Sequence, residues 1–524
     1  MKHRSSLVAR GIFILTASIA LAAIFCMNLL YASPFVSSWD EADFALAVDR
    51  FDLLAMQPHF PGYPYFIAGA KLVHAWVVDP AQSLILWNAV LALSSALPIT
   101  LLARRSVGWI NALWVAVGVQ SLPYLWLMGS RPMSECAGIA VLWWYLWSVR
   151  SALDRPQSNI RLGAAILLFS ILMGIRLSYF PFGIALALLL IIQFSSAANS
   201  RGRLRRLILA IAAIGISQLV WIGGLVQSEG TLPGFWKLST AFVEGHFSEW
   251  GGGIADSSMP IGTRLVTLIK DHLIRDIWFS RSVVLAVAYG LLLAAAAWGI
   301  GRLRGSRWND TAEQRSGKWL LISLAAYAIW VLLGQNIEKP RHIAPVAGPL
   351  LLILYAGALR VAQLLREASI GCRGWHGHKA AAGAIYIAVA GLLVSQSIVG
   401  AQWLKLQAGQ KPAVYQLNDY MKTLDQPFVL YTWEETRVLH YLQAEYEHRK
   451  IVTFDYFQSL VQSGNGQRIY LTNHVLEGFL QQNADAAKGV IPVAEFASED
   501  LFDPVYSRIT VYEWMRPDEG QAEK

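Results

Sequence analysis

Long apolar segments separated by short clusters of arginine and lysine constrain the fold of this chain more than any other feature. A membrane-spanning helix needs about 20 apolar residues, and eleven segments reach or approach that length. They lie near residues 9–31, 83–103, 107–128, 136–147, 162–175, 179–194, 207–226, 283–300, 319–334, 343–358 and 380–400. Only 15% of the residues are charged, against about 25% in soluble domains. The sequence therefore predicts a polytopic α-helical membrane protein.

The basic residues give this arrangement an orientation. Cytoplasmic loops of membrane proteins carry an excess of Lys and Arg, and with a cytoplasmic N-terminus every loop on that side contains basic residues, such as Arg104 and Arg105. The formal net charge of +8 arises largely from these loops, so we exclude nucleic acid as a partner. The outer segments are then residues 33–82, 129–135, 227–281 and everything after Gln402. We expect a multi-pass protein of the cytoplasmic membrane, held in the lipid bilayer.

The chain changes character near residue 402. Residues 1–402 contain the apolar segments, whereas residues 403–524 are polar and have no run long enough to span a membrane. In this tail, strands are predicted at 428–431, 468–471 and 509–512, and helices at 418–424, 436–446 and 475–482. About 120 residues suffice for a small domain. The tail is therefore predicted to be an extracytoplasmic α/β domain.

Two outer loops carry more than a simple connection needs. Loop 33–82 contains an apolar stretch, 62–78, which we expect to lie on the outer leaflet, because counting it as a span would move Arg104 and Arg105 outside. Loop 227–281 is too long for a plain connection and has three glycines, 251–253, next to aromatic residues. That composition fits a lid over a bound ligand, or equally a surface loop.

An acidic cluster follows the first apolar segment. Ser38 and Glu41 have the spacing of a capping box, which predicts a helix start with Asp40, Glu41 and Asp43 in its first turn. A helix N-terminus favours anionic side chains, so these carboxylates should stay ionised. Ionised carboxylates suit a general base or a metal ligand. Taken alone, the cluster fits a surface helix with a stabilising first turn even better.

Several short motifs together resemble those of the GT-C glycosyltransferases, in particular the bacterial aminoarabinose transferase and protein O-mannosyltransferase branch. The segments that carry the resemblance are Trp39-Asp40-Glu41, His59 to Pro64, Arg104 to Gly108, Ser130 to Glu135 and Pro340 to Pro345. The second resembles H-P-P-L-Y-Y but has Phe60 and Gly62, and the fourth has Glu135 where many relatives have Asp. The fifth resembles R-Y-x-x-P with His342 for Tyr. The resemblance runs in order from Met1 to about Leu365.

The resemblance implies a hexosyl- or pentosyltransferase whose donor is a sugar on a polyprenyl phosphate and whose acceptor is a glycan, lipid or protein at the outer face. It implies a catalytic group, a phosphate-binding group and a substrate-binding group of side chains. These are Asp40, Glu41 and Glu135; Arg341, Arg176 and Lys339; and His59, Tyr63 and His342. Asp40 is the expected general base. Glu41 is expected to share that role or to support a divalent metal, the one cofactor for which the resemblance leaves room.

Two other classes of protein remain open from the sequence. A transporter or flippase would explain the helices and Arg176, although no internal repeat of the kind that transporters often show is present. A non-catalytic scaffold would explain the outer tail. The chain has no P-loop, no dinucleotide fingerprint, no nucleophile elbow and no H-E-x-x-H, which argues against ATP-driven transport, dinucleotide chemistry and serine or zinc hydrolysis.

Overall fold

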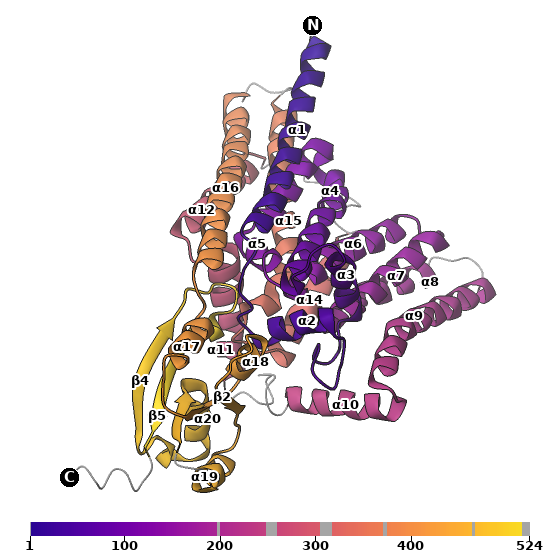
Figure 1. The fold of residues 1–524 in the computed structure, drawn as a ribbon. Coiled ribbons are helices and arrows are strands. Elements are labelled where there is room, and N and C mark those ends of the chain that lie inside the picture. Colours follow the sequence, from indigo (N-terminus) through magenta and orange to yellow (C-terminus); the bar gives the residue numbers. More distant parts are fainter. Residues whose placement is uncertain are drawn as a thin grey trace.

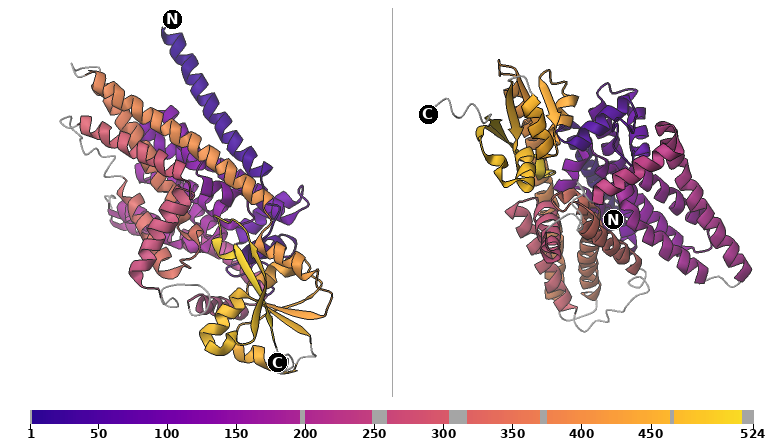
Figure 2. Two further views of the ribbon diagram at one scale, coloured as in Figure 1. Left: turned by 90° about the vertical axis from the view of Figure 1, so that its left-hand side faces the viewer. Right: turned by 90° about the horizontal axis from the view of Figure 1, so that it is seen from below.

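The computed structural model describes residues 2–195, 200–247, 259–303, 317–369, 375–463 and 467–515. A long bundle of helices carries a mixed α/β unit at one end, and the two chain termini lie at opposite ends of the molecule (Figure 1). The side view in Figure 2 shows the same separation between α1, which projects at one end, and the tail at the other.

The bundle consists of α1 (Lys2–Leu30), α4 (Pro80–Gln120), α5 (Pro123–Gly129), α6 (Ser134–Asp154), α7 (Asn159–Ile175), the 3₁₀ helix η1 (Leu177–Phe182), α8 (Gly183–Ser195), α9 (Ser200–Glu229), α12 (Val283–Arg302), α14 (Lys318–Gly334), α15 (Ala344–Ala368) and α16 (Trp375–Gly409). Within the described ranges, seven helices are long and apolar enough to cross a membrane, and three shorter ones are also apolar. Each of the eleven predicted segments corresponds to one helix, to part of α4, or to two helices in succession.

Gly108, at the start of the third predicted segment, breaks α4 in two. Its φ of 71° is in the left-handed region, which glycine adopts without the steric cost that a side chain would bring. Just before it, Arg105 forms an ion pair with Asp154 at the end of α6. The basic turn that we expected here is therefore a sharp break that is tied to the neighbouring helix.

The interruption predicted between residues 162 and 194 is present. α7 ends at Ile175, η1 turns the chain, and α8 begins at Gly183. Arg176 is the C-cap residue of α7. Its side chain thus starts from a helix end rather than from the middle of the bundle.

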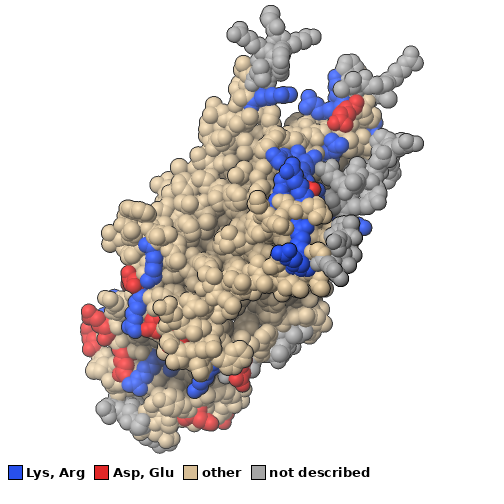
Figure 3. All heavy atoms as spheres, turned by 90° about the vertical axis from the view of Figure 1, so that its right-hand side faces the viewer, with Lys and Arg blue, Asp and Glu red and all other residues tan. Residues whose placement is uncertain are grey.

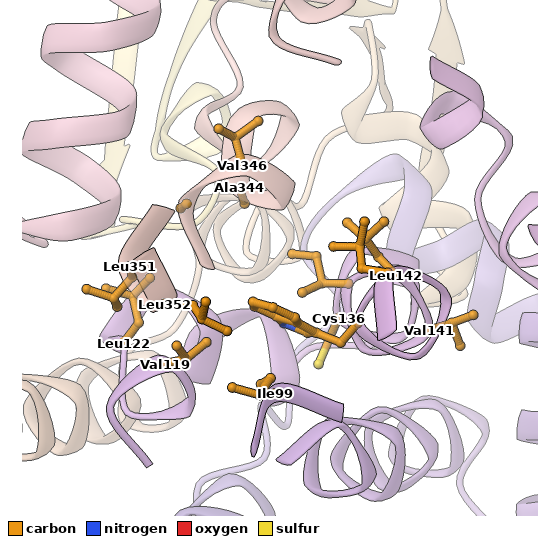
Figure 4. Packing of buried hydrophobic residues seen from close by; sticks show 14 of the residues in the cluster. Ile99, Val119, Leu122, Cys136, Val141, Leu142, Ala344, Val346, Leu351 and Leu352 are labelled. Atoms are coloured by element: carbon orange, nitrogen blue, oxygen red, sulfur yellow. The ribbon is translucent and has the colours of Figure 1, made fainter. Parts of the chain in front are cut away.

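The centre of the bundle is formed by α4, α6 and α15. Figure 4 shows their buried side chains packed together, among them Ile99, Val119, Cys136, Leu142, Leu351 and Leu352. Gly118 lets α4 approach α15 closely, because a Cβ at that position would lie 2.6 Å from the ring of Tyr355. Gly348 of α15 similarly fits against Trp143 of α6, 3.1 Å from where its Cβ would be. These contacts fix α15, whose N-terminal end leads into the cavity described below.

The middle of the bundle surface is apolar. Figure 3 shows a broad band with few Lys, Arg, Asp or Glu side chains between two charged ends. Large hydrophobic side chains are exposed on α9, α12 and α16, for example Leu219, Leu291 and Ile387. An extended apolar surface of this kind marks contact with a membrane or a partner, and the length of the helices favours the membrane.

Shorter helices connect the bundle elements on the side of the tail. They are α2 (Trp39–Asp49), α3 (Pro64–His74), α10 (Leu232–Gly245), α11 (Ile261–Val266), the π-helix η3 (Thr267–Trp278) and the 3₁₀ helix η4 (Pro340–Ile343). α3 has 11 residues and is too short to span a bilayer. This length agrees with its predicted position on the outer leaflet. The glycines 251–253 of the predicted lid lie outside the described residues.

The tail is a three-layer α/β/α unit. It contains α17 (Ala413–Met421), β1 (Phe428–Thr432), α18 (Glu435–Tyr441), β2 (Glu447–Lys450), α19 (Phe454–Ser463), β3 (Arg468–Thr472), α20 (Asn473–Gln482), η5 (Ala484–Ala487), β4 (Val490–Ala497), η6 (Pro504–Tyr506) and β5 (Arg508–Trp514). The strand order is β2-β1-β3-β5-β4; β2 and β3 run parallel to β1, and β5 runs antiparallel to β3 and β4. Residues of α17 and α18 pack on one face of the sheet, and residues of α19 and α20 pack on the other. The inner strand β1 is buried along its whole length, as a strand covered on both faces must be.

The three predicted strands of the tail and its three predicted helices are present. The predicted helix 436–446 ends at Tyr441, because the chain turns there into β2. β2, β4 and α19 were not predicted. At the predicted boundary between bundle and tail there is no break, since α16 continues to Gly409.

Candidate active site

A cavity of about 700 Å³ lies where the bundle, its connecting segments and the tail meet. Side chains from α2, η1, α10 and η4 line it, together with residues that follow β1 and end β2. Of the nine side chains predicted to form a site, those that line the cavity are Asp40, His59, Tyr63, Arg176, Lys339, Arg341 and His342. The other two, Glu41 and Glu135, are buried and take no part in its lining.

The position of Asp40 follows from the start of α2. The predicted capping box is present: the Ser38 hydroxyl accepts the Glu41 N–H, and the Glu41 carboxylate accepts the Ser38 N–H. This reciprocal pair fixes the first turn of the helix. Asp40 lies in that turn, with 29% of its side chain exposed.

Several cations surround the Asp40 carboxylate. Burial alone would raise the pKa of Asp40, but the positive charges of His59, Arg341 and Lys339 outweigh burial and hold the pKa well below its usual range. Asp40 Oδ2 accepts a hydrogen bond of 2.8 Å from Nη2 of Arg341. Asp40 is therefore an ionised carboxylate that faces the cavity.

Arg341 brings three carboxylates together around one guanidinium group. In addition to its hydrogen bond to Asp40, Arg341 has its Nε 3.0 Å from Oε1 of Glu135, and its Nη1 donates to Asp503 of the tail. The side chain of Arg341 is only 2% exposed. A buried charge is tolerated when it is paired in this way, so Arg341 is the centre of the ionic cluster.

Glu135 lies between two arginines. Its Oε1 is 2.9 Å from Nη2 of Arg176 and 3.0 Å from Nε of Arg341, but neither nitrogen is aligned for a directed hydrogen bond, so the contacts are ionic. Arg176 also donates to the Ser134 hydroxyl at 2.6 Å. This arrangement lets Glu135 position both guanidinium groups, and it gives the side chain no access to a substrate.

Glu41 is turned away from the cavity. Its carboxylate accepts hydrogen bonds from Nε of Arg131 at 2.5 Å and from the N–H of Ser37 at 2.7 Å. The residue is fully buried. Glu41 thus completes the helix cap and an ion pair, and the cavity contains no part of it.

His59 is held by an aspartate to which we gave no role. Its Nδ1 lies 2.9 Å from Oδ2 of Asp43, its Nε2 lies 3.0 Å from the Tyr63 hydroxyl, and Nε2 is 3.9 Å from Asp40. Burial alone would lower the pKa of His59, but the hydrogen bond to Asp43 and the charges of both aspartates outweigh it and raise the pKa. Asp43 also accepts a hydrogen bond from Arg437 of α18. The only sequence signal that placed Asp43 beside the site was its spacing of three residues from Asp40, which puts both side chains on one face of the helix.

Lys339 and His342 flank Arg341. Nζ of Lys339 donates to the Tyr506 hydroxyl at 3.2 Å, and that hydroxyl donates to Glu434. Nδ1 of His342 lies 3.0 Å from the carbonyl oxygen of Asn336. The connection before α15 therefore presents two cations to the cavity, Lys339 and Arg341, and the tail supplies a partner for each, Tyr506 and Asp503.

The tail contributes a wall of the cavity that the sequence analysis did not predict. Trp433 and Glu434 follow β1, and Lys450 ends β2, so they lie at the carboxyl ends of two parallel strands, where α/β sheets commonly bind ligands. Nζ of Lys450 lies 4.4 Å from the centre of the Trp433 ring and 4.9 Å from that of Trp39. The carboxyl ends of parallel strands could have indicated this wall from the sequence, but β2 was not predicted, so its end could not be placed beside that of β1.

Another part of the cavity lining is apolar. α10 contributes Leu238, Ala241, Phe242 and Val243, and other elements contribute Phe60, Phe180 and Trp330. Phe60 packs against Phe242 with ring centres 5.2 Å apart. The cavity thus has one ionic wall and one hydrophobic wall.

No group of three or more His, Cys, Asp or Glu side chains in the described ranges is arranged to hold a metal ion. The carboxylates closest to the cavity are paired with arginines instead, as in Asp40 with Arg341 and Asp43 with Arg437. The divalent metal named among our expectations stays a prediction.

The fold and the cavity together define a multi-pass helical protein with an ionic site at one end of its bundle. No family model matches the sequence, and no curated protein matches it. Among solved structures, ArnT from Cupriavidus metallidurans bound to undecaprenyl phosphate superposes with a TM-score of 0.53 at 12% sequence identity, over 95% of this chain and 97% of that protein. The apo state of the same ArnT gives a TM-score of 0.51 at 14% identity, over 96% and 98%. This likeness confirms the predicted fold, including the α/β tail.

Proposed function

We propose that this protein is a membrane glycosyltransferase that moves a sugar from a polyprenyl-phosphate donor to an acceptor at the outer face of the membrane. The observation that carries the proposal is the ionised, accessible carboxylate of Asp40 beside Arg341, in a cavity with one ionic and one hydrophobic wall. The binding of undecaprenyl phosphate by ArnT, which has the same fold, supports a donor of this class.

The two walls suit the two parts of such a donor. The α10 side can cover the first isoprene units, since it presents Phe242 and its apolar neighbours. Arg176, Lys339 and Arg341 can bind the phosphate, because guanidinium groups match phosphate oxygens in pairs and a lysine adds a point charge. The sugar would then lie next to Asp40.

Asp40 is the proposed general base for the acceptor hydroxyl or amine. With Arg341 as its partner it is a weak base, since its pKa is held low. A donor phosphate that binds Arg341 would compete with Asp40 for the guanidinium and weaken that hold. Binding of the donor would therefore raise the basicity of Asp40 at the moment when the acceptor needs it.

The acceptor is proposed to enter beside the tail. Trp39 and Trp433 offer aromatic surface, and Glu434 and Lys450 offer a hydrogen-bond acceptor and a cation. Aromatic and polar groups in this combination suit a sugar or other hydroxylated headgroup better than an isoprenoid chain. Residues 403–524 would then select the acceptor.

A transporter would place its polar residues near the middle of the membrane. Here Glu135 is in the first turn of α6, Arg176 ends α7, and Arg341 precedes α15. The ionic cluster therefore lies at helix ends beside the tail, which favours chemistry at one face over passage through the bundle.

The function is tested with the purified full-length protein and with cells that lack it. The purified protein should bind undecaprenyl phosphate. Cells that lack the protein should lose one modified glycan, glycolipid or glycoprotein, detected by mass spectrometry. No binding together with an unchanged envelope would rule the proposal out.

The outer-face assignment has a separate test. In intact cells an impermeant thiol reagent should label a cysteine placed at Lys488 of the tail but not one placed at Asn159, which precedes α7. The opposite pattern would put the site on the cytoplasmic side.

A further inference from the structure

The ionic cluster around Arg341 has no surplus of positive charge. Its cations are Arg176, Lys339, Arg341 and His59, and the carboxylates that face them are Asp40, Glu135, Asp503 and Asp43. A donor phosphate would add at least one further negative charge to this cluster. Because the cluster is largely buried, that charge must be compensated nearby.

Asp503 differs from the other two carboxylates around Arg341. Asp40 is partly exposed, and Glu135 lies between two guanidinium groups. Asp503 is fully buried; among the described residues it is paired with Arg341 alone, and its Oδ1 has no hydrogen-bond partner there. Asp503 also does not line the cavity, so a ligand can bind Arg341 without displacing it.

The tail holds Asp503 firmly in place. The carbonyl oxygen of Phe502 accepts a hydrogen bond of 2.9 Å from the Tyr124 hydroxyl of α5, and the Asp503 N–H donates to Oδ1 of Asp500 at 2.8 Å. Asp500 in turn pairs with Arg131 at 2.9 Å. Since this segment is anchored twice, a proton is a simpler way to neutralise Asp503 than movement of the chain.

We propose that Asp503 takes up one proton when a polyprenyl phosphate binds beside Arg341, so that the tail supplies the charge compensation of the phosphate site. The inference rests on the proposed function, because it assumes that the ligand of Arg341 is a phosphate. Free Oδ1 can carry the proton while Oδ2 stays against Arg341. The anion that binds and the proton that enters then leave the charge of the cluster unchanged.

The pKa of Asp503 is shifted in the direction that proton uptake requires. Burial raises the pKa of Asp503 to about 6, against the opposing charges of Arg341, Lys339 and Arg131; the nearby Asp500 raises it further. Tyr124 of α5 lies next to this segment, and its hydroxyl donates to the carbonyl oxygen of Phe502. A bound phosphate would raise the pKa of Asp503 again. Affinity should therefore be constant below about pH 6 and fall as the pH rises above it.

The experiment measures binding of the methyl ester of undecaprenyl phosphate to the full-length protein in nanodiscs from pH 5.5 to 8. This ester carries one fixed negative charge, so the ligand itself does not titrate. For the wild type we expect the affinity to fall by up to about tenfold for each pH unit above 6, as uptake of one proton dictates. Asp503→Asn mimics the protonated side chain, so it should bind the ester at least about tenfold more tightly at pH 7.5 and with a flatter pH profile.

Asp500→Asn is the matched control. It removes a carboxylate three residues earlier that also pairs with an arginine, and its amide oxygen can still accept the Asp503 N–H. It should keep the wild-type slope. Weaker binding by Asp503→Asn with a wild-type slope would overturn the proposal, since it would make Asp503 a structural partner of Arg341 only.

Calorimetry of the wild type in buffers of different ionisation enthalpy gives a readout that does not depend on the variant folding. At pH 7 about one proton should enter per ester bound. Binding without proton uptake would refute this inference and leave the proposed function intact. Failure of the wild type to bind the ester at any pH would instead refute the proposed function.

Discussion

The helical bundle and the tail both deliver charged side chains to one cavity, but they do so from different kinds of structure. The bundle uses residues at helix ends: Asp40 in the first turn of α2 and Arg341 just before α15. The tail uses residues that follow strands or lie in connections, such as Trp433 after β1 and Asp503 before η6. Caps and apolar runs mark helix ends in a sequence, whereas connections carry no such signal. From the sequence, the part of such a site that lies at helix ends can therefore be predicted, and the part that lies in connections cannot.

The largest effect should come from Asp40 in the bundle. Asp40→Asn keeps the shape of the side chain and removes its basicity, so we expect transfer to slow by about 10²–10⁴-fold. Binding of undecaprenyl phosphate should be kept or become tighter, since the asparagine oxygen can still accept from Arg341 but no longer competes with the phosphate as an anion. Rates measured with purified protein test this, and a near wild-type rate would move the general base to another residue.

Glu41, its neighbour, should behave in the opposite way. Glu41→Gln breaks a fully buried ion pair with Arg131, which typically costs about 3–5 kcal/mol of stability when one partner is removed. Thermal denaturation should register that loss, while the transfer rate per folded molecule stays near that of the wild type. A loss of rate comparable to that of Asp40→Asn at full stability would restore Glu41 as a catalytic group.

Arg437 tests whether the tail acts on the chemistry through the bundle. Its guanidinium donates to Asp43 and to the carbonyl oxygens of Ala55 and Met56, and Asp43 orients His59. Arg437→Lys cannot make all three contacts at once, so we expect about a tenfold fall in rate and a shift in the pH profile assigned to His59. If the fall in rate leaves the pH profile unmoved, Arg437 is only a structural clamp between the two regions.

The smallest effect should come from the cavity wall of the tail. Trp433→Ala should raise the KM for the acceptor several-fold, which corresponds to about 1 kcal/mol of lost contact, and leave binding of undecaprenyl phosphate unchanged. Trp433→Phe should recover most of the loss. Weaker donor binding in Trp433→Ala would contradict the division between a donor side in the bundle and an acceptor side in the tail.

The comparison also explains what the sequence could predict. Periodic apolar runs and arginine clusters were enough for the eleven helical segments, and a capping box placed Asp40 in the first turn of α2. The pairing of Arg341 with Asp503 joins residues 162 positions apart, and no local pattern encodes such a contact. For the same reason Glu41 and Asp40 look alike in sequence, although one faces Arg131 and the other faces the cavity.

The salt bridge between Asp40 and Arg341 has a consequence for biosynthesis. Arg341 is 301 residues further along the chain than Asp40. At about 5–20 residues per second, a ribosome needs roughly 15–60 s to make that stretch. During this interval Asp40 is already made but lacks its guanidinium partner, and the Asp503 segment follows later still. The cavity is therefore assembled last. A chain that stops before the tail would contain the complete helical bundle but an incomplete site.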